Sequence, residues 1–399
     1  MFEPDAGGHR LTYLRQLLPA LDGLGAVTVV VGEGAIGTEA FRVQLGELRE
    51  THRFESVTFD KRGGMLGKAR ARLDALRAAM DLCDPEHVFI PSGDGLAQLL
   101  GMPGSMKRLA LKAGVQIEVG MHRGSFAYPS RTLKERVIRG ATLRSLTRAP
   151  LQRVQFVDVL AYEWLRDRGH PLAARASVLA DPVDPVEDVS KSEARRVLGM
   201  PEDGRVIGTS GHLDERKGVD RLLRAFRSAD LGDSDRLLLA GRPSPGIREL
   251  IAGEFADMVS SGRIVAMTRY LTDEELSATL AACDVVCTCH PAHVGLSNIC
   301  LRAAAAGRPV LSGDYGWFDR VVGGFGLGWT CRVTDERAFS AAIARALDSA
   351  GSFEVGDRAQ ALLAFHSQAN ARRTFTASLR DRLGLERDDG LIDWESLDA

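Results

Sequence analysis

The stretch Val206–Phe226, V-I-G-T-S-G-H-L-D-E-R-K-G-V-D-R-L-L-R-A-F, decides the fold class of this 399-residue chain. A short apolar run ends at Gly208, a turn of small residues follows, and a basic loop runs from His212 to Lys217. Leucine and phenylalanine then recur at helical spacing. The order strand, loop, helix is typical of a parallel α/β sheet, in which such a loop lies at the carboxyl end of a strand, where ligands bind. The alternative is a solvated basic turn.

A second stretch strengthens the ligand-binding interpretation. The pattern predicts a strand over Ile264–Arg269, a helix over Leu271–Ala282 with a cap-like acidic start, and a strand over Asp284–Thr288. The loop Gly295-Leu296-Ser297-Asn298 and a small-residue helix over Ile299–Ala306 follow. The backbone N–H groups at the start of this helix point into the same crevice as the basic loop and form a natural anion site. Two anion sites in one crevice suit a pyrophosphate.

In this order, the series resembles the retaining glycosyltransferases of family 4, which have the GT-B fold. The resemblance is densest over Val206–Val310 and extends more weakly to G-G-H-R-L-T-Y-L-R-Q-L near the start. It implies an α/β protein of two Rossmann-like parallel-sheet domains facing across a cleft. It is carried by G-H-L-D-E-R-K-G-V-D-R-L-L-R-A-F, L-L-L-A-G at 237–241, Y-L-T-D-E-E-L at 270–276, and G-L-S-N-I-C-L-R-A-A-A-A-G-R-P-V.

Composition is that of an ordinary globular protein, with 45% hydrophobic and 26% charged residues. The net charge of −2 argues against a nucleic-acid partner, although residues 1–182 carry 25 Lys and Arg against 20 Asp and Glu. The sequence shows neither a signal peptide nor an apolar run of bilayer length. The six cysteines lie mostly in apolar segments, which indicates reduced thiols and a cytoplasmic protein, with peripheral association to the inner membrane face left open.

We predict three segments: an N-terminal Rossmann-like acceptor domain (1–182), a Rossmann-like donor domain (183–370), and a helix that returns to the first domain before an acidic tail (371–399). The linker is Asp181-Pro182-Val183-Asp184-Pro185, because two prolines flanked by aspartates cannot continue a helix. The returning helix is expected over Ala371–Leu383, and the tail after Leu385 is expected to be disordered. Only Met1–Glu3 precedes the first glycine turn, so either the first strand is very short or the true start lies upstream.

Within the first domain, alternating strands and helices indicate a parallel sheet. The predicted strands are 27–31, 56–59, 87–90, 115–119 and 154–159, and the predicted helices are 11–21, 64–79, 133–146 and 161–169.

The resemblance assigns the donor site. Lys217 is expected to hold the donor pyrophosphate and to stabilise the leaving diphosphate, with Arg216 as a flanking charge. His212 stands where the family usually has arginine, so any charge on it depends on pH. The phosphates are expected to meet Gly295, Leu296, Ser297, Asn298 and Ile299, and Tyr270 completes the donor set.

The family usually has two glutamates separated by seven residues, which contact the donor sugar and the ribose. The matching positions here are Val294 and Arg302. This departure puts the donor type, and to a lesser extent activity itself, in doubt. Arg302 either meets a phosphate or an acidic donor group, or is a plain helix-surface residue.

In the first domain, Gly7 and Gly8 match the glycine turn of the family that approaches the donor. His122 follows the strand 115–119, where the family often has a histidine facing the reaction centre, so it is our second catalytic candidate. His9 and Asp94 are acceptor-site candidates. The rival role of Asp94 is to cap the helix Gly95–Leu100.

A cluster of Cys283, Cys287, Cys289, His290 and His293 invites a metal reading. Alternation along the strand puts Cys287 and Cys289 on one face, which is consistent with core packing, and zinc sites usually show paired C-x-x-C spacing. We therefore predict no metal site and no cofactor, the nucleotide sugar being a co-substrate.

The predicted function is transfer of a sugar from a nucleotide-sugar donor to a small-molecule, saccharide or lipid-linked acceptor, with retention. The alternatives are a GT-B phosphorylase or nucleotide-sugar epimerase, and a non-catalytic nucleotide-sugar binder. A dinucleotide dehydrogenase is disfavoured because no G-x-G-x-x-G opens the first helix. The basic helix Leu133–Leu146 either docks on anionic lipid or packs its apolar stripe on the sheet.

Overall fold

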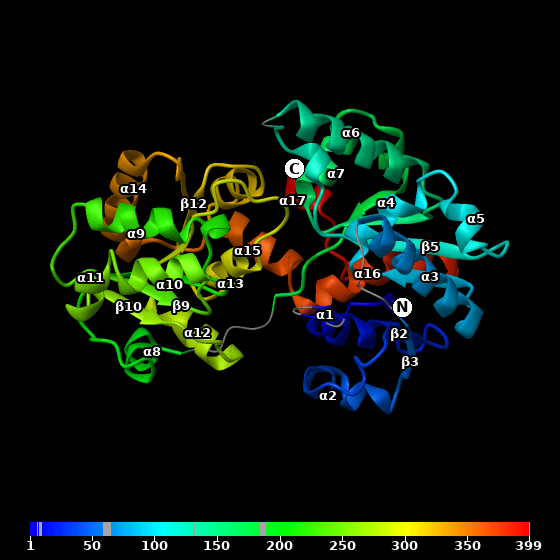
Figure 1. Cartoon of the computed structure of the whole chain (residues 1–399), viewed down its shortest axis with the longest axis horizontal. Helices are drawn as coiled ribbons and strands as arrows, with labels where there is room; N and C mark the ends of the chain where they lie inside the picture. Colours follow the sequence, from blue (N-terminus) through cyan, green and yellow to red (C-terminus); the bar gives the residue numbers. More distant parts are fainter. Residues whose placement is uncertain (6, 8–9, 59–64, 131, 184–188, 399) are drawn as a thin grey trace. The chain divides into compact units, whose positions relative to one another are not determined.

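The computed structural model describes residues 1–399 except 6, 8, 9, 59–64, 131, 184–188 and 399, with backbone only at 65, 66, 273 and 398. The chain divides into two compact units. Unit 1 comprises Met1–Pro182, Val294–Leu296 and Phe365–Ala399, and unit 2 comprises Val183–His293 and Ser297–Ala364. Both ends of the chain therefore lie in unit 1 (Figure 1).

The strands of unit 1 are all parallel and form the sheets β1-β2-β3 and β4-β5-β6-β7, with β1 beside β4. They are β1 (Phe2–Glu3), β2 (Thr28–Gly32), β3 (Arg53–Val57), β4 (His87–Ile90), β5 (Gln116–Met121), β6 (Arg153–Phe156) and β7 (Ala176–Val178). The helices are α1 (Arg10–Leu17), α2 (Glu39–Leu45), α3 (Met65–Cys83), α4 (Ala97–Leu100), α5 (Ser105–Leu109), α6 (Leu133–Arg148), α7 (Val159–Asp167), α16 (Gln368–Arg382) and α17 (Glu395–Asp398).

Unit 2 is one parallel sheet of order β10-β9-β8-β11-β12-β13. Its strands are β8 (Val206–Ser210), β9 (Arg236–Ala240), β10 (Ile264–Met267), β11 (Val285–Thr288), β12 (Val310–Gly313) and β13 (Gly328–Cys331). Its helices are α8 (Lys191–Val197), α9 (Val219–Ser228), α10 (Pro245–Ala252), α11 (Ala256–Ser260), α12 (Asp273–Ala282), α13 (Asn298–Ala305), α14 (Glu336–Ser349) and α15 (Asp357–Phe365).

Local pattern explains most of unit 2. In α9, the apolar residues Val219, Leu222, Leu223 and Phe226 follow helical spacing, and all four are fully buried in the core beneath the sheet. Helix α12 begins at a capping box in which Thr272 accepts from the N–H of Glu275 while the Glu275 side chain accepts from the N–H of Thr272. The predicted α/β class with parallel sheets is confirmed.

Several predicted boundaries were wrong. Strand β3 begins at Arg53, three residues before the predicted start, and the predicted end at Phe59 lies outside the described residues. Strand β6 ends at Phe156 because Asp158 turns inward to accept two hydrogen bonds, so α7 begins at Val159. Ser210, predicted in a turn, still pairs with Ala240 and belongs to β8.

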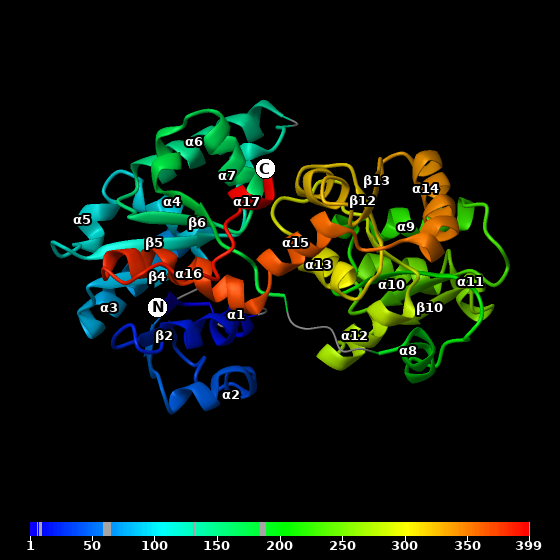
Figure 2. The ribbon, with the colours of Figure 1, turned by 180° about the vertical axis from the view of Figure 1, so that it is seen from behind.

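Helix α16 packs on the sheet of unit 1, lying along β4 and β5 (Figures 1 and 2). The Ser378 hydroxyl donates to Glu118 of β5 over 2.6 Å, and Gln155 of β6 donates to the carbonyl of Phe375. Both pairs are buried. These bonds join residues more than 200 positions apart, so the end of the chain is built into the first unit.

The expectation of a disordered tail was wrong. Trp394 is almost fully buried, and its indole N–H donates to Glu163 of α7 over 3.1 Å. The side-chain amide of Asn370 on α16 also donates to the carbonyl of Ile392. One large aromatic side chain in a predominantly acidic segment is enough to fix the tail, because a tryptophan buries more apolar area than any other residue.

Candidate functional site

The order of strands reverses in unit 2 between β8 and β11. The chain runs outward from β8 through β9 to β10, then returns to β11 on the other side of β8 and continues outward through β12. In an open parallel sheet, ligands bind outside the carboxyl ends of the strands at this switch point. We call the residues that follow β8, β11 and β12 the carboxyl edge of unit 2.

The loop after β8 is locked against the segment after β11. Asp214 accepts from the N–H of Lys217 over 2.8 Å and caps the 3-10 turn Glu215–Lys217. The Cys289 thiol donates to the carbonyl of Lys217 over 3.2 Å. Gly218 has φ +75°, and a Cβ there would lie 2.2 Å from the carbonyl oxygen of Cys289. Only glycine fits this close approach.

Lys217 lies half-buried at the carboxyl edge of unit 2. Burial lowers the pKa of its ammonium group, and Asp214 partly opposes that shift. Its Nζ approaches the Ser210 carbonyl at 3.5 Å, a marginal hydrogen bond. The protein thus offers the Lys217 charge few partners of its own. This arrangement is expected for a residue that binds a ligand anion.

The other predicted residues of this loop are exposed. His212 and Arg216 approach the Asp214 carboxylate at 3.9 Å and 3.4 Å, so the same acid serves both side chains and the Lys217 turn. Tyr270 follows β10, the outermost strand on that side, and its side chain is 86% exposed. The sheet order therefore places Tyr270 away from the switch point.

Helix α13 begins at the same edge. Its N-cap Ser297 is buried and makes no side-chain cap bond, and the predicted residues Asn298 and Ile299 form the first turn. Arg302 is one turn further along and is only 9% exposed. The alternative prediction, that Arg302 is a helix-surface residue, was therefore wrong.

Gly295 and Leu296, also predicted to hold phosphates, are grouped with unit 1 instead. The N–H of Gly295 donates to the Tyr128 hydroxyl over 2.9 Å. Gly295 has φ +99°, and a Cβ there would lie 2.5 Å from the carbonyl of His122. Their role in holding phosphates stays a prediction.

Polar atoms without partners gather at the carboxyl edge of unit 2. Within the described part of the chain, four buried atoms near it lack a hydrogen bond: Ser210 Oγ at the end of β8, His290 Nδ1 after β11, Arg302 Nε on α13 and Trp317 Nε1 after β12. Buried polar groups in native proteins are nearly always paired, so such a cluster marks a place that a ligand or water completes.

His290 is a buried histidine at this edge, beside positively charged groups. Its ring stacks near His293 at 4.8 Å and Phe318 at 5.5 Å between ring centroids. Burial, then the charges of His293, Lys217 and Arg216, lower the pKa of His290 to about 2. His290 is therefore neutral, and the edge favours anions.

The carboxyl edge of unit 1, which we define as the residues after β1, β4 and β5, contains His122 and Asp94. Asp94 accepts from the N–H groups of His122 and Arg123 over 3.2 Å and 2.8 Å. It makes no capping bond to its own helix, so the capping alternative was wrong. The His122 ring pairs with the Pro91 carbonyl at 3.2 Å and packs edge-on against Tyr13. Gly7 is exposed, and Gly8 and His9 lie outside the described residues.

The sequence analysis missed Asp158 and Tyr128. Asp158 is fully buried and accepts from the N–H of Gly124 and the hydroxyl of Tyr128, each over 3.0 Å. Burial raises the pKa of Asp158 to about 7. An aspartate within the predicted strand 154–159 was the available signal, since a buried acid needs partners.

The cysteine cluster is part of the core of unit 2. Cys287 and Cys289 are buried there, and burial raises the pKa of Cys287 well above its ordinary value. Within the described residues, no group of three His, Cys, Asp or Glu side chains is placed to hold a metal.

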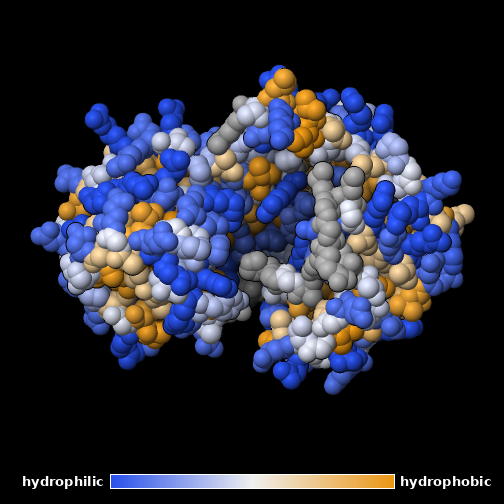
Figure 3. Space-filling model, in the orientation of Figure 1, coloured by the Kyte–Doolittle hydropathy of each residue, from blue (hydrophilic) through white to orange (hydrophobic). Residues whose placement is uncertain are grey.

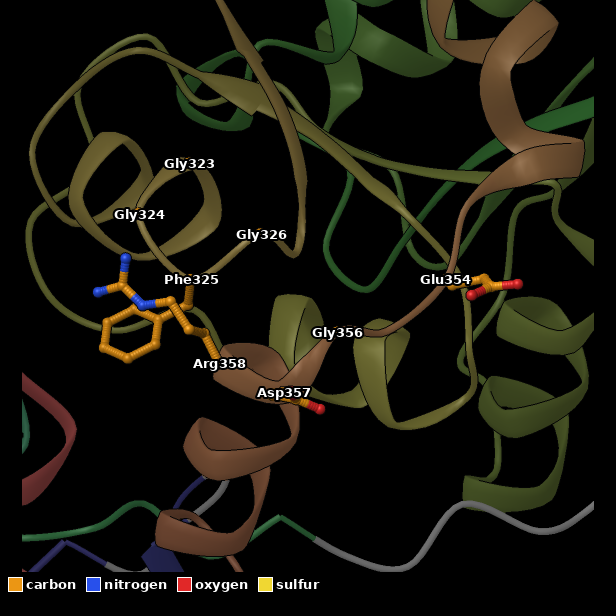
Figure 4. Close-up of a pocket in the computed structure, with 8 residues that line it drawn as sticks. All are labelled: Gly323, Gly324, Phe325, Gly326, Glu354, Gly356, Asp357 and Arg358. Carbon is orange, nitrogen blue, oxygen red and sulfur yellow. The ribbon is translucent and has the colours of Figure 1, made fainter.

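A separate cavity of about 430 Å³ lies in unit 2 (Figure 4). It is lined by Gly323–Gly326 and by residues 354 and 356–358, and Arg358 lies 5.3 Å from the centroid of the Phe325 ring. The glycine segment precedes β13, so the cavity lies at the amino end of that strand and contains none of the predicted residues.

Comparison with known proteins shows what the chain is similar to. Residues 190–359, almost all of unit 2, match the family described as "Glycosyl transferases group 1". Unit 2 therefore resembles the group 1 glycosyl transferases. The D-inositol 3-phosphate glycosyltransferase of Stackebrandtia nassauensis is 28% identical over 205 residues, 46% of each protein. The chain thus matches less than half the length of this curated relative.

Two solved structures show that the chain has the GT-B fold. The sucrose-phosphate synthase of Thermosynechococcus elongatus has a TM-score of 0.69 at 18% identity, covering 96% of this chain and 95% of its own. Anabaena HepE, solved with UDP, has a TM-score of 0.67 at 15% identity, covering 95% and 98%. The predicted GT-B fold and the resemblance to family 4 are confirmed. No helix in the described residues is long and apolar enough to cross a membrane.

Proposed function

We propose that this protein transfers a sugar from a nucleotide-sugar donor to an acceptor, with retention of the anomeric configuration. The observation that carries the proposal is the carboxyl edge of unit 2, where Lys217 and the start of α13 meet unpaired buried polar atoms at the switch point. The group 1 family match supports sugar transfer as the reaction class.

In this mechanism the protein positions charge and supplies no nucleophile. The bond between the sugar and the diphosphate breaks, the acceptor oxygen bonds to the same face of the sugar, and the acceptor proton passes to the leaving phosphate. Lys217 and the N–H groups at the start of α13 stabilise the developing negative charge. These groups neutralise the diphosphate without a metal or other cofactor.

His122 is the proposed catalytic residue of unit 1. A carbonyl oxygen only accepts, so the hydrogen bond to Pro91 requires that Nε2 carries the proton. In the neutral ring, Nδ1 then keeps its lone pair and accepts from a sugar or acceptor hydroxyl. Asp94 positions His122 by holding the N–H of its backbone.

The first experiment is a thermal-unfolding screen across nucleotide sugars, since a ligand at 100 times its dissociation constant adds about 2.7 kcal/mol of stability. Candidate acceptors are then added with the stabilising donor, and the anomeric configuration of the product is read by NMR. Inversion would contradict the retaining mechanism, and the absence of stabilisation by any nucleotide sugar would contradict the donor site.

A non-catalytic binder is the second candidate, because Val294 and Arg302 stand where the family has its paired glutamates. Measurable donor hydrolysis would argue against it.

A phosphorylase or epimerase is distinguished from a transferase by following nucleotide release, which a transferase couples to the acceptor.

The acceptor class is suggested by α6. Leu133, Val137 and Ile138 are exposed beside the exposed Lys134 and Arg136, with Leu133 72% exposed. An apolar patch lies over the start of α6 (Figure 3). The alternative that the whole apolar stripe packs on the sheet was wrong, because only Leu146 of this helix is buried. We infer weak association with anionic lipid and hence a lipid-linked acceptor.

Vesicle sedimentation tests this inference. The protein is expected in the pellet with anionic vesicles at low salt, and in the supernatant with neutral vesicles or at high salt, because salt screens exposed charges. Val137→Ser should weaken pelleting. Val43→Ser, at an equally exposed valine on α2, is the matched control. No pelleting at low salt would leave a free small molecule or saccharide as the acceptor.

A further inference from the structure

Arg302 is a buried cation without a counter-charge. It is 9% exposed, and its Nε has no hydrogen-bond partner. Among the residues that the structure describes, no carboxylate pairs with its guanidinium. An unpaired buried charge is among the most costly features a fold can hold. It is retained where binding of an anion compensates it.

Helix geometry directs this guanidinium toward the carboxyl edge of unit 2. Helix α13 starts at that edge and runs back toward the amino end of the next strand, β12. Side chains on a helix lean toward its N-terminus, so Arg302 extends back over the first turn, formed by Asn298 and Ile299. Cys300, which contacts Thr288 of β11 at 3.5 Å, lies on the opposite side of the helix.

The charges at the carboxyl edge of unit 2 add to the demand for an anion, although Arg302 itself lies in the last turn of α13, where the helix dipole favours a cation. The edge already holds Lys217 and Arg216, and their charges help to keep His290 neutral. Asp214 contacts Arg216 and His212 and caps the Lys217 turn, so it does not neutralise Arg302.

We propose that Arg302 determines donor specificity by binding a second anionic group, a carboxylate on the sugar or a phosphate ester on the ribose, in addition to the diphosphate. This inference rests on the proposed donor site. Lys217 and the N–H groups at the start of α13 provide for the diphosphate. The guanidinium, one turn further along the helix, has its own requirement for an anion, and its planar fork suits either group.

The test uses pairs of nucleotides that differ by one anionic group. Calorimetry compares UDP-glucuronic acid with UDP-glucose for a sugar carboxylate, and 3′-phospho-ADP with ADP for a ribose phosphate. The wild-type protein is expected to bind the more anionic member of one pair about ten- to a hundredfold more tightly, the effect of a charge-assisted hydrogen bond. The pair that shows the preference identifies the source of the anion.

Arg302→Gln is expected to abolish the preference, and Arg302→Glu to reverse it, because a carboxylate repels anions and accepts from hydroxyls. Arg308→Gln is the matched control. The Nε of Arg308 also has no partner, but this residue stands where β12 begins, at the amino end of the sheet, and its charge acts on Cys283 before β11. Equal binding within both pairs by the wild-type protein, or an unchanged preference in Arg302→Gln, would overturn the proposal.

Two further measurements do not depend on nucleotide binding. Inorganic phosphate should raise the midpoint of thermal unfolding of the wild-type protein more than that of Arg302→Gln. Arg302→Met should raise this midpoint without ligand by about 2–4 °C, since it removes an unpaired buried charge. If phosphate acts in this way and no nucleotide binds, the anion site stands and the proposed function fails. If Arg302→Met lowers the midpoint and phosphate has no effect, Arg302 is structural.

Discussion

The carboxyl edges of the two units differ in how their polar groups are satisfied. In unit 1, the carboxylates of Asp94 after β4 and Asp158 after β6 each accept two hydrogen bonds from the segment after β5. Among the described residues near that edge, the unpaired buried oxygens are on Glu3 and Tyr13. In unit 2, Ser210, His290 and Arg302 each have a buried polar atom without a partner. Where the polar groups of an edge bond to one another, the fold holds them in place. Where buried polar groups lack partners, a bound ligand completes their hydrogen bonds. Substitutions in unit 1 should therefore cost stability, and those in unit 2 should cost binding and turnover.

The largest expected effect is that of Lys217→Ala. Turnover should fall about 10²–10³-fold, the usual loss for one preorganised donor, while the fold stays intact because Lys217 has no strong internal partner. The measurement is transfer rate together with a thermal unfolding curve. Lys112→Ala, which removes an exposed lysine paired with Asp84 in unit 1, is the control and should leave both unchanged. Wild-type turnover in folded Lys217→Ala would refute the assignment.

The second effect is on the stability of unit 1. The pKa of Asp158 is raised to about 7 in the folded protein, so its stabilising contribution is complete below the ordinary value of 3.8 and is lost as pH rises through 7. Between pH 5 and pH 8, this group alone should cost about 2–3 kcal/mol of unfolding free energy. Urea unfolding across that range should show this slope for the wild-type protein and a flatter one for Asp158→Asn. Identical slopes would contradict the prediction.

The smallest effect is the difference in unfolding free energy between Gly218→Ala and Gly262→Ala. It separates the cost of a tight contact from the cost of backbone strain. Gly218 and Gly262 have nearly the same φ, +75° and +77°, but only a Cβ at Gly218 would meet another atom. Alanine at either position costs the backbone penalty of about 1–2 kcal/mol. Gly218→Ala should cost about 1–3 kcal/mol more because of overpacking, and it should also weaken donor binding. Equal unfolding free energies for the two variants would show that the loops after β8 and β11 are not locked together.

Sequence reasoning reached furthest where structure depends on neighbouring residues. The elements β8 and α9 and the capping box of α12 follow from apolar spacing and cap chemistry within about ten residues. The bonds from Asp94 to His122 and from Asp158 to Tyr128 span about 30 positions, and spacing carries no information about them. The burial of Arg302 agrees with the first of its two predicted roles, which came from the family resemblance, because helical spacing alone places a cation on the exposed face.

The built-in C-terminal segment has a consequence for synthesis. Every residue of unit 2 precedes Phe365, so all of unit 2 is synthesised before the segment that covers unit 1. Unit 1 begins at Met1 yet needs Ser378 and Trp394, which are made later than all of unit 2. Part of the first unit therefore stays uncovered until α16 has been made. A nonsense mutation between Phe365 and Ser378 would spare the unit it follows and cripple the unit that began the chain.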